Sequence, residues 1–351
     1  MRESDTSFEA ASRRQPVADK PVLSLDTNYL SNLARARKDE GLPSHVLDVW
    51  KDLLDALIDA VWDDRLICPG FNIQVEELEM DDRIAASAWV VMRSLSLGLA
   101  FHTFDGIVAR QVEDVVRKFM QQPPVEEPAW KRVMQEDPDL PAAEMSLRSS
   151  AKGVTLGFSD RNTVQKRRQG KTIGVGDVIT DSGLDVILQG SASESRLAFG
   201  RLVIGQRLMD TLVGSQLSPG AWCVPARTDE WSEMVSRLQS VGMGFRELIA
   251  FLQSPWLAHI PFVDLYCSVA RAAAHQGTTG RPDEPGDEAD RCIVSTLLPY
   301  CSLLTTDRFV KHLITTELDL AAQYGCQVFS GKVEDVRLLT EVIRMLPAVT
   351  L

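Results

Sequence analysis

Residues 286–309, GDEADRCIVSTLLPYCSLLTTDRF, restrict the possible folds of this chain more than any other stretch. An apolar helix is expected there to lead almost directly into an apolar strand. Residues 293–298 are mostly apolar, and Pro299 is expected to end the helix because proline cannot continue the helical hydrogen bonding. Residues 301–306, CSLLTT, have the short apolar and β-branched composition of a buried strand. A helix and a buried strand so close together predict an α/β arrangement.

Three carboxylates frame this unit. Asp287 and Asp290 are three residues apart, so they lie on one helical face, and Asp307 follows the strand directly. In open α/β sheets, ligands bind in the crevice at the carboxyl ends of the strands. A second apolar strand is expected at residues 22–26, with Asp26 at its end. Parallel pairing of the two strands would therefore bring acids from both ends of the chain together.

Four short motifs together resemble the PIN-like nuclease family, in a subgroup with a longer chain. They are LDTN at 25–28, a helix-starting Asp followed by IVST at 290–296, LPYC at 298–301 and TTD at 305–307. The match covers about residues 20–85 and 255–345, and the middle of the chain carries no resemblance. The resemblance implies an α/β fold in which a PIN-like parallel sheet is flanked by helices and interrupted by a large, mainly helical insertion.

Apolar periodicity divides the chain in the same way. Helical patterns are expected from about Asn28, at 44–63 and at 83–97, with a short strand at 65–68. A strand at 325–330 and a last helix at 333–345 close the chain. The predicted division is a disordered tail at 1–20, the first part of the PIN-like domain at 21–104, a mainly helical insertion with a basic loop at 105–285, and the second part of the domain at 286–351.

The resemblance also implies a carboxylate site for Mg or Mn, since hard divalent cations prefer oxygen ligands. The expected catalytic residues are Asp26, Glu77, Asp290 and Asp307, and the expected metal ligands are Asp26, Glu76, Glu77, Asp287, Asp290 and Asp307. Glu77 is preferred to Glu76 because Glu-Leu at 77–78 looks like the family motif, but the choice stays open. Asn28, Thr305 and Thr306 are expected to support the site. A bound ion would activate water for in-line attack on phosphorus.

Each acid has a simpler interpretation. Asp26, Asp287 and Asp307 are each placed to cap a helix, and Asp290 would lie in a first helical turn, where the helix dipole favours a negative charge. The subgroup often has an acid after its PYC triplet, whereas this chain has Ser302. That departure removes one ligand and leaves room for a module without activity.

The net charge of −12 argues against a globally basic nucleic-acid binder. One segment differs: residues 148–171 carry seven Lys or Arg against one Asp. It is either a solvated loop or an arm that contacts a nucleic-acid backbone through Lys166, Arg167, Arg168 and Lys171.

Composition predicts a soluble, cytoplasmic protein. No apolar run approaches the roughly 18 residues of a membrane span, and the first 20 residues lack the apolar stretch of a signal peptide. The six cysteines form no CxxC pair and lie mostly among apolar neighbours, which favours reduced, buried thiols.

The sequence thus predicts a metal-dependent endoribonuclease, with RNA expected in preference to DNA on the strength of the resemblance alone. A toxin or defence role, a protein inhibitor and a homo-oligomer are compatible with this hypothesis. The alternatives are a PIN-like module that binds RNA or protein without cutting, and a phosphatase on a related sheet. Residues 26–28, Asp-Thr-Asn, lack the second Asp of haloacid-dehalogenase-type phosphatases, and Gln165 stands where a phosphate-binding loop would need glycine.

Overall fold

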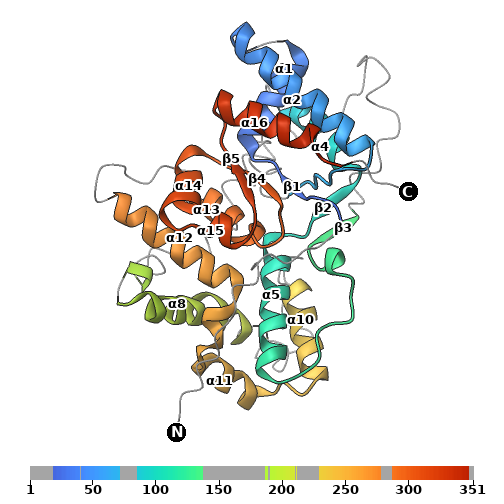
Figure 1. Ribbon diagram of the computed structural model, residues 1–351. Helices are drawn as coiled ribbons and strands as arrows, with labels where there is room; N and C mark the ends of the chain where they lie inside the picture. The colour runs from blue at the N-terminus through green and yellow to red at the C-terminus, as the bar shows by residue number, and fades with distance from the viewer. Residues whose placement is uncertain are drawn as a thin grey trace, which may run out of the picture.

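Three short parallel strands form the centre of the fold. β1 (Leu23–Ser24), β4 (Leu303–Thr305) and β5 (Gln327–Phe329) lie in the order β1-β4-β5, as Figure 1 shows. Leu23 pairs with Leu303, so the expected parallel pairing between the first strand and the strand before Asp307 is confirmed. The computed structural model describes residues 19–39, 41–71, 85–136, 186–188, 190–209, 211, 229–277 and 287–347.

Most of the described chain is helical. The helices are α1 (Thr27–Lys38), α2 (Ser44–Trp62), α4 (Ala85–Ser96), α5 (Phe104–Phe119), α8 (Ala192–Gly200), α10 (Asp229–Ser240), α11 (Phe245–Gln253), α12 (Pro261–Gly277), α13 (Asp287–Leu297), α14 (Arg308–His312), α15 (Leu320–Gln323) and α16 (Val333–Arg344). Shorter turns are 3₁₀-helical at η1 (Ala129–Arg132) and η4 (Pro255–His259) and π-helical at η3 (Arg201–Gly205) and η5 (Leu313–Glu317). In the part of the chain described, no helix is both long and apolar enough to cross a bilayer.

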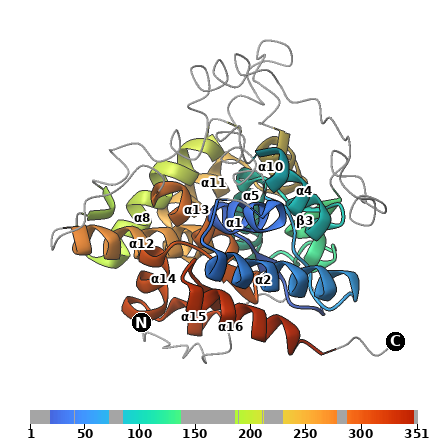
Figure 2. The same ribbon diagram turned by 90° about the horizontal axis from the view of Figure 1, so that it is seen from above.

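The alternation of side chains along each strand divides the core into two layers. Leu303 packs among α1, α2, α4 and α16, whereas its neighbour Leu304 packs among α5, α12 and α13. This follows from the pleat, which points successive side chains to opposite faces. The other strands divide in the same way, with Val22 and Val328 on the side of α5 and Leu23 and Phe329 on the side of α16. Both faces of the sheet are therefore covered by helices, which lie above and below it in Figure 1 and are seen from above in Figure 2.

The fold contains a second, smaller pair of strands that the sequence did not predict. β2 (Leu99–Phe101) pairs antiparallel with β3 (Met134–Glu136), and Gly70 forms a parallel bridge to Ala100. The strand expected at 65–68 is reduced to a single parallel bridge between Val22 and Ile67. Three-residue strands are too short for an alternating pattern to stand out, because period-two alternation needs about four residues or more.

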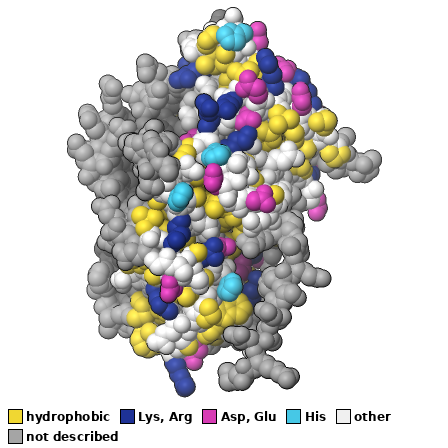
Figure 3. All heavy atoms as spheres, turned by 60° about the vertical axis from the view of Figure 1, so that its left-hand side comes forward, with side chains coloured by type: hydrophobic (Ala, Val, Ile, Leu, Met, Phe, Trp, Pro, Cys, Tyr) yellow, Lys and Arg dark blue, Asp and Glu magenta, His cyan; other side chains and the backbone are white. Residues whose placement is uncertain are grey.

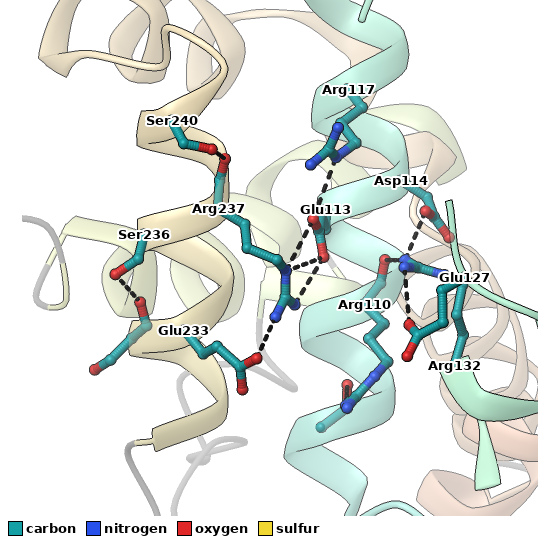
Figure 4. A network of polar contacts seen from close by, with 12 residues as sticks. Arg110, Glu113, Asp114, Arg117, Glu127, Arg132, Glu233, Ser236, Arg237 and Ser240 are labelled. Carbon is teal, nitrogen blue, oxygen red and sulfur yellow. Dashed lines mark hydrogen bonds and ion pairs between the residues drawn. The ribbon is translucent and has the colours of Figure 1, made fainter. Parts of the chain in front are cut away.

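An ion-pair network centred on a buried carboxylate joins α5 to α10, as Figure 4 shows. The Glu113 carboxylate on α5 has no exposed surface and accepts hydrogen bonds from Arg237 on α10, the shortest at 2.9 Å, and from Arg117 at 3.2 Å. Glu233, which is mostly exposed, contacts the same Arg237 at 2.7 Å. Two guanidinium groups on one buried carboxylate offset the cost of removing that charge from water.

The cysteines that the structure describes agree with the prediction of buried, unbridged thiols. They are Cys68, Cys267, Cys292, Cys301 and Cys326, and Cys223 lies outside the described residues. Burial raises the pKa of the Cys68 thiol to about 12, so this thiol stays protonated and unreactive at neutral pH.

Candidate functional site

Asp26 lies where β1 ends and α1 begins, at the carboxyl edge of the sheet. Its side chain is 5% exposed, and its Oδ2 accepts a hydrogen bond from the Asn28 backbone N at 3.3 Å, which makes it the N-cap of α1. Its own backbone N donates to Thr305 Oγ1 at 2.6 Å, and that hydroxyl donates in turn to the Ser24 carbonyl at 3.3 Å. Thr305 therefore ties the end of β1 to the end of β4 and fixes where Asp26 stands.

Asp307 stands at the same edge, two residues after β4 ends. It is the N-cap of α14, and its Oδ1 accepts a hydrogen bond from the Val310 backbone N at 2.6 Å. The capping interpretation left open for Asp26 and Asp307 is thus confirmed for both. A cap role does not exclude a second role, because a carboxylate has two oxygens and about four acceptor positions.

A third acid, which the sequence analysis did not single out, joins this edge from α16. Asp335 Oδ2 accepts hydrogen bonds from the Ser330 backbone N at 2.8 Å, from the Ser330 hydroxyl and from Lys311 Nζ at 2.7 Å. Burial raises the pKa of Asp335, but the hydrogen bonds from Lys311 and Ser330 outweigh it and leave the pKa below its ordinary value. Asp335 is therefore a carboxylate at neutral pH.

Tyr29 connects the ends of the outer strands β1 and β5. Its ring is buried and packs edge-on against Trp50, with 4.9 Å between ring centroids, and its hydroxyl donates to the Ser330 carbonyl at 2.6 Å. Burial, followed by the negative charges of Asp335 and Asp26, raises the pKa of Tyr29 far above its ordinary value. The phenol is therefore held protonated as a hydrogen-bond donor.

An open hollow of about 650 Å³ lies beside these acids. Its lining is Asp307, Arg308, Phe309, Lys311, His312, Thr315, Thr316, Ser330, Lys332 and Asp335. Figure 3 shows the side of the molecule where α12 and α14 lie in Figure 1, and Lys and Arg side chains recur along this face among Asp, Glu and His. A concave, mixed-charge surface at the carboxyl edge of a parallel sheet is where an α/β protein is expected to bind a ligand.

Of the remaining predicted metal ligands, the structure describes only some side chains. Asp290 is half-buried on α13, which packs against α12 and α5 and touches α14. Asp287 begins α13, but its side chain, like the whole of Glu76 and Glu77, lies outside the described residues. Among the side chains that are described, no three His, Cys, Asp or Glu are grouped closely enough to hold a metal ion. Asp26, Asp290 and Asp307 therefore do not form such a group by themselves.

The supporting residues act mainly on the backbone. Asn28 is exposed and contributes its backbone N to Asp26, while Thr306 is buried and its backbone N donates to the Phe329 carbonyl at 3.0 Å. Ser302, at the position where the family subgroup often has an acid, accepts a hydrogen bond from the Val22 backbone N at 3.3 Å. The predicted nucleic-acid contacts Lys166, Arg167, Arg168 and Lys171 lie outside the described residues.

The sequence contains one local cue to Asp335. It is an acid in the first turn of a helix that follows a strand, whereas Asp26 and Asp307 are N-caps that stand closer to their strands. Its partner Lys311 carries no comparable cue, because the pairing of α14 with α16 depends on the path of the chain.

Comparisons with protein-family models, with curated proteins and with solved structures find no match to this chain. The architecture alone defines its class, a largely helical α/β protein with a small parallel sheet.

Proposed function

We propose that this chain is a PIN-like, metal-dependent endonuclease that hydrolyses phosphodiester bonds, with RNA preferred to DNA. The observation that supports the proposal best is the bond between the Asp26 backbone N and Thr305 Oγ1, 2.6 Å long across 279 residues of sequence. Together with the parallel pairing of β1 and β4, it holds Asp26 at the strand end that Asp307 follows. Acids from opposite ends of the chain thus share one edge.

The donors at this edge suit a hard divalent cation. Carboxylates and hydroxyls are oxygen ligands, which Mg²⁺ and Mn²⁺ prefer to nitrogen or sulfur. Asp26 and Asp307 would hold the ion from adjacent strands, with Asp290, Asp287 and Glu76 or Glu77 as the further expected ligands. The bound ion would supply activated water and would stabilise the charge that develops on the phosphodiester. Thr305 would keep the Asp26 backbone in register while a strand of RNA is bound.

Substitution of the two described acids by asparagine tests the proposal without removing the caps, because asparagine caps helices as well as aspartate does. We expect Asp26→Asn and Asp307→Asn each to lower cleavage of end-labelled single-stranded RNA with Mn²⁺ by about 100-fold or more, since each removes a charged metal ligand. Asp59→Asn, an exposed acid on α2, is the matched control and should leave the rate unchanged. Cleavage that survives both site substitutions would rule the metal site out.

A second function, RNA binding without cleavage, is favoured by three observations. Asp26 and Asp307 already cap helices, Asp335 is engaged by Lys311, and the described side chains contain no group of three potential ligands. Under this alternative, intact RNA is recovered after incubation with Mn²⁺, and its affinity is the same in Mn²⁺ as in EDTA. Calorimetric titration with Mn²⁺ separates the two functions independently, because only the nuclease requires binding that Asp26→Asn weakens.

A further inference from the structure

The hollow beside Asp307 carries more positive than negative side chains, in a protein with the opposite balance overall. The whole chain has 37 Lys and Arg against 49 Asp and Glu, yet the hollow is lined by three Lys or Arg and two Asp. The cations come from two separate elements, Arg308 and Lys311 from α14 and Lys332 from the residue before α16. An excess of one sign of charge on a concave surface attracts ligands of the opposite sign.

The three cations of the hollow differ in whether they already form an ion pair. Lys311 is committed to Asp335 at 2.7 Å, and its side chain is only 26% exposed. Arg308 and Lys332 are exposed, and neither has an ion pair in the described part of the chain. The two acids of the lining are also committed, because Asp335 accepts from Lys311 and Ser330 while Asp307 caps α14. Arg308 and Lys332 are therefore the cations of the hollow that a ligand can engage, and the lining keeps a positive excess with both carboxylates counted.

The hydroxyl groups and the volume of the hollow indicate which class of ligand it can bind. Thr316 is exposed on the wall of the hollow, next to Thr315, whose hydroxyl donates to the Lys311 carbonyl at 2.7 Å. A volume of about 650 Å³ is within the range of small-molecule sites and exceeds the needs of a single phosphate group. A polar, cationic lining with hydroxyls suits phosphate and sugar, which receive half to two-thirds of protein–DNA hydrogen bonds from such side chains.

We propose that this hollow holds the phosphate backbone of the nucleic-acid strand, and that Arg308 and Lys332 are its two phosphate contacts. The proposal rests on the proposed function for the identity of the polymer and adds the path of the strand, which passes Asp307 and the start of α16. Arg308 offers a planar fork that matches two phosphate oxygens, and Lys332 offers a point charge. The contacts position the strand and carry no sequence preference.

Binding of a labelled 12-nucleotide oligouridylate, measured by fluorescence anisotropy in EDTA, tests the proposal. We expect the double variant Arg308→Gln with Lys332→Gln to bind about tenfold more weakly at low salt, because two charge-assisted contacts are lost. The slope of log affinity against log salt should become shallower by about 1.4, since each single-strand phosphate contact contributes about 0.7. Lys118→Gln with Arg246→Gln is the matched control: it removes the same charges from exposed positions on α5 and α11 and should lower affinity less than twofold.

A charge-keeping variant separates a lost contact from a damaged fold. Arg308→Lys with Lys332→Arg should retain most of the affinity, and all variants should show the wild-type circular dichroism spectrum. Wild-type affinity in the double glutamine variant, or an equal loss in the control, would overturn the proposal. Equal binding of uridine monophosphate and the oligonucleotide would reassign the hollow to small phosphates, and equal competition by a polyglutamate peptide would reassign it to acidic proteins.

The test is independent of catalysis because no divalent cation is present. If RNA binds through Arg308 and Lys332 but is never cut, the nuclease proposal fails and the backbone contact stands. If RNA is cut but the double variant binds like wild type, the contact fails and the nuclease stands.

Discussion

The interface between α5 and α10 and the carboxyl edge of the sheet both bring acids close to basic side chains. The two regions differ in how far those charges are buried and paired. Between α5 and α10, the fully buried carboxylate of Glu113 forms ion pairs with Arg237 and Arg117. At the sheet edge, Asp307 caps a helix through the backbone, while Arg308 and Lys332 remain exposed on the wall of a hollow. A buried charge must be neutralised within the protein, whereas an exposed cation is solvated by water that a ligand can replace.

The contrast teaches which charges hold the fold and which are available for function. Removing a partner from the buried network leaves uncompensated charge in the interior, so stability should fall steeply there. Removing an exposed, unpaired cation should leave stability almost unchanged and alter only binding.

The largest effect is expected at the buried carboxylate. Glu113→Ala should lower the free energy of unfolding by about 3 kcal/mol, because it removes the carboxylate that pairs with the largely buried Arg117 and leaves Arg237 with the exposed Glu233 as its partner. Glu233→Ala is the control: this acid contacts the same Arg237 but is 67% exposed, so its loss should cost at most about 1 kcal/mol. Urea denaturation of both variants at pH 7 provides the measurement, and equal losses would show that burial does not distinguish the two acids.

An intermediate effect, dependent on pH, is expected at Asp335. Because its pKa is lowered in the folded protein, its contribution is present above the unfolded pKa of about 3.9 and is lost as the pH falls through the folded pKa. Asp335→Asn should therefore cost about 1 kcal/mol at pH 7, with the gap to wild type closing below about pH 4.

Thermal unfolding between pH 7 and pH 3 follows this gap directly. Glu334→Gln changes the neighbouring exposed acid on the same helical turn and should leave the wild-type pH profile intact. A gap that instead widened on acidification would mean that Asp335 is protonated in the folded protein.

The smallest effect on stability is expected for the cations of the hollow. Arg308→Gln with Lys332→Gln should change the free energy of unfolding by no more than about 0.5 kcal/mol, as is usual for surface substitutions without a partner. Urea denaturation of this variant beside Glu113→Ala compares the two regions in one experiment. A loss above about 2 kcal/mol would assign these cations to the fold.

Much of the secondary structure could be predicted because it depends on local pattern. The helix expected at 44–63 is α2 (Ser44–Trp62), and the helix expected at 333–345 is α16 (Val333–Arg344). Both carry a continuous apolar stripe that packs one helix on the other. Strands β2 and β3 were missed because three residues contain too little alternation to be recognised.

The site could be predicted only where an acid follows a strand. Asp26 and Asp307 were found in this way, and their shared edge follows from the parallel pairing of β1 and β4. The engagement of Asp335 by Lys311 was not found, since it joins α14 to α16 through space and leaves no periodic trace in the chain. The same holds for Tyr29. In the sequence it is an ordinary apolar position of α1, and only the fold shows that its hydroxyl donates a hydrogen bond to the Ser330 carbonyl.

Local sequence is enough to predict the main helices, the strands at 22–26, 301–306 and 325–330 and the acids Asp26 and Asp307, because propensity, capping and periodicity act over a few neighbouring residues. Only the tertiary structure decided that β5 lies beside β4, that Lys311 is occupied by Asp335, and that Arg308 and Lys332 meet around one hollow. Those relations depend on how distant segments pack, and packing is set by the whole core at once.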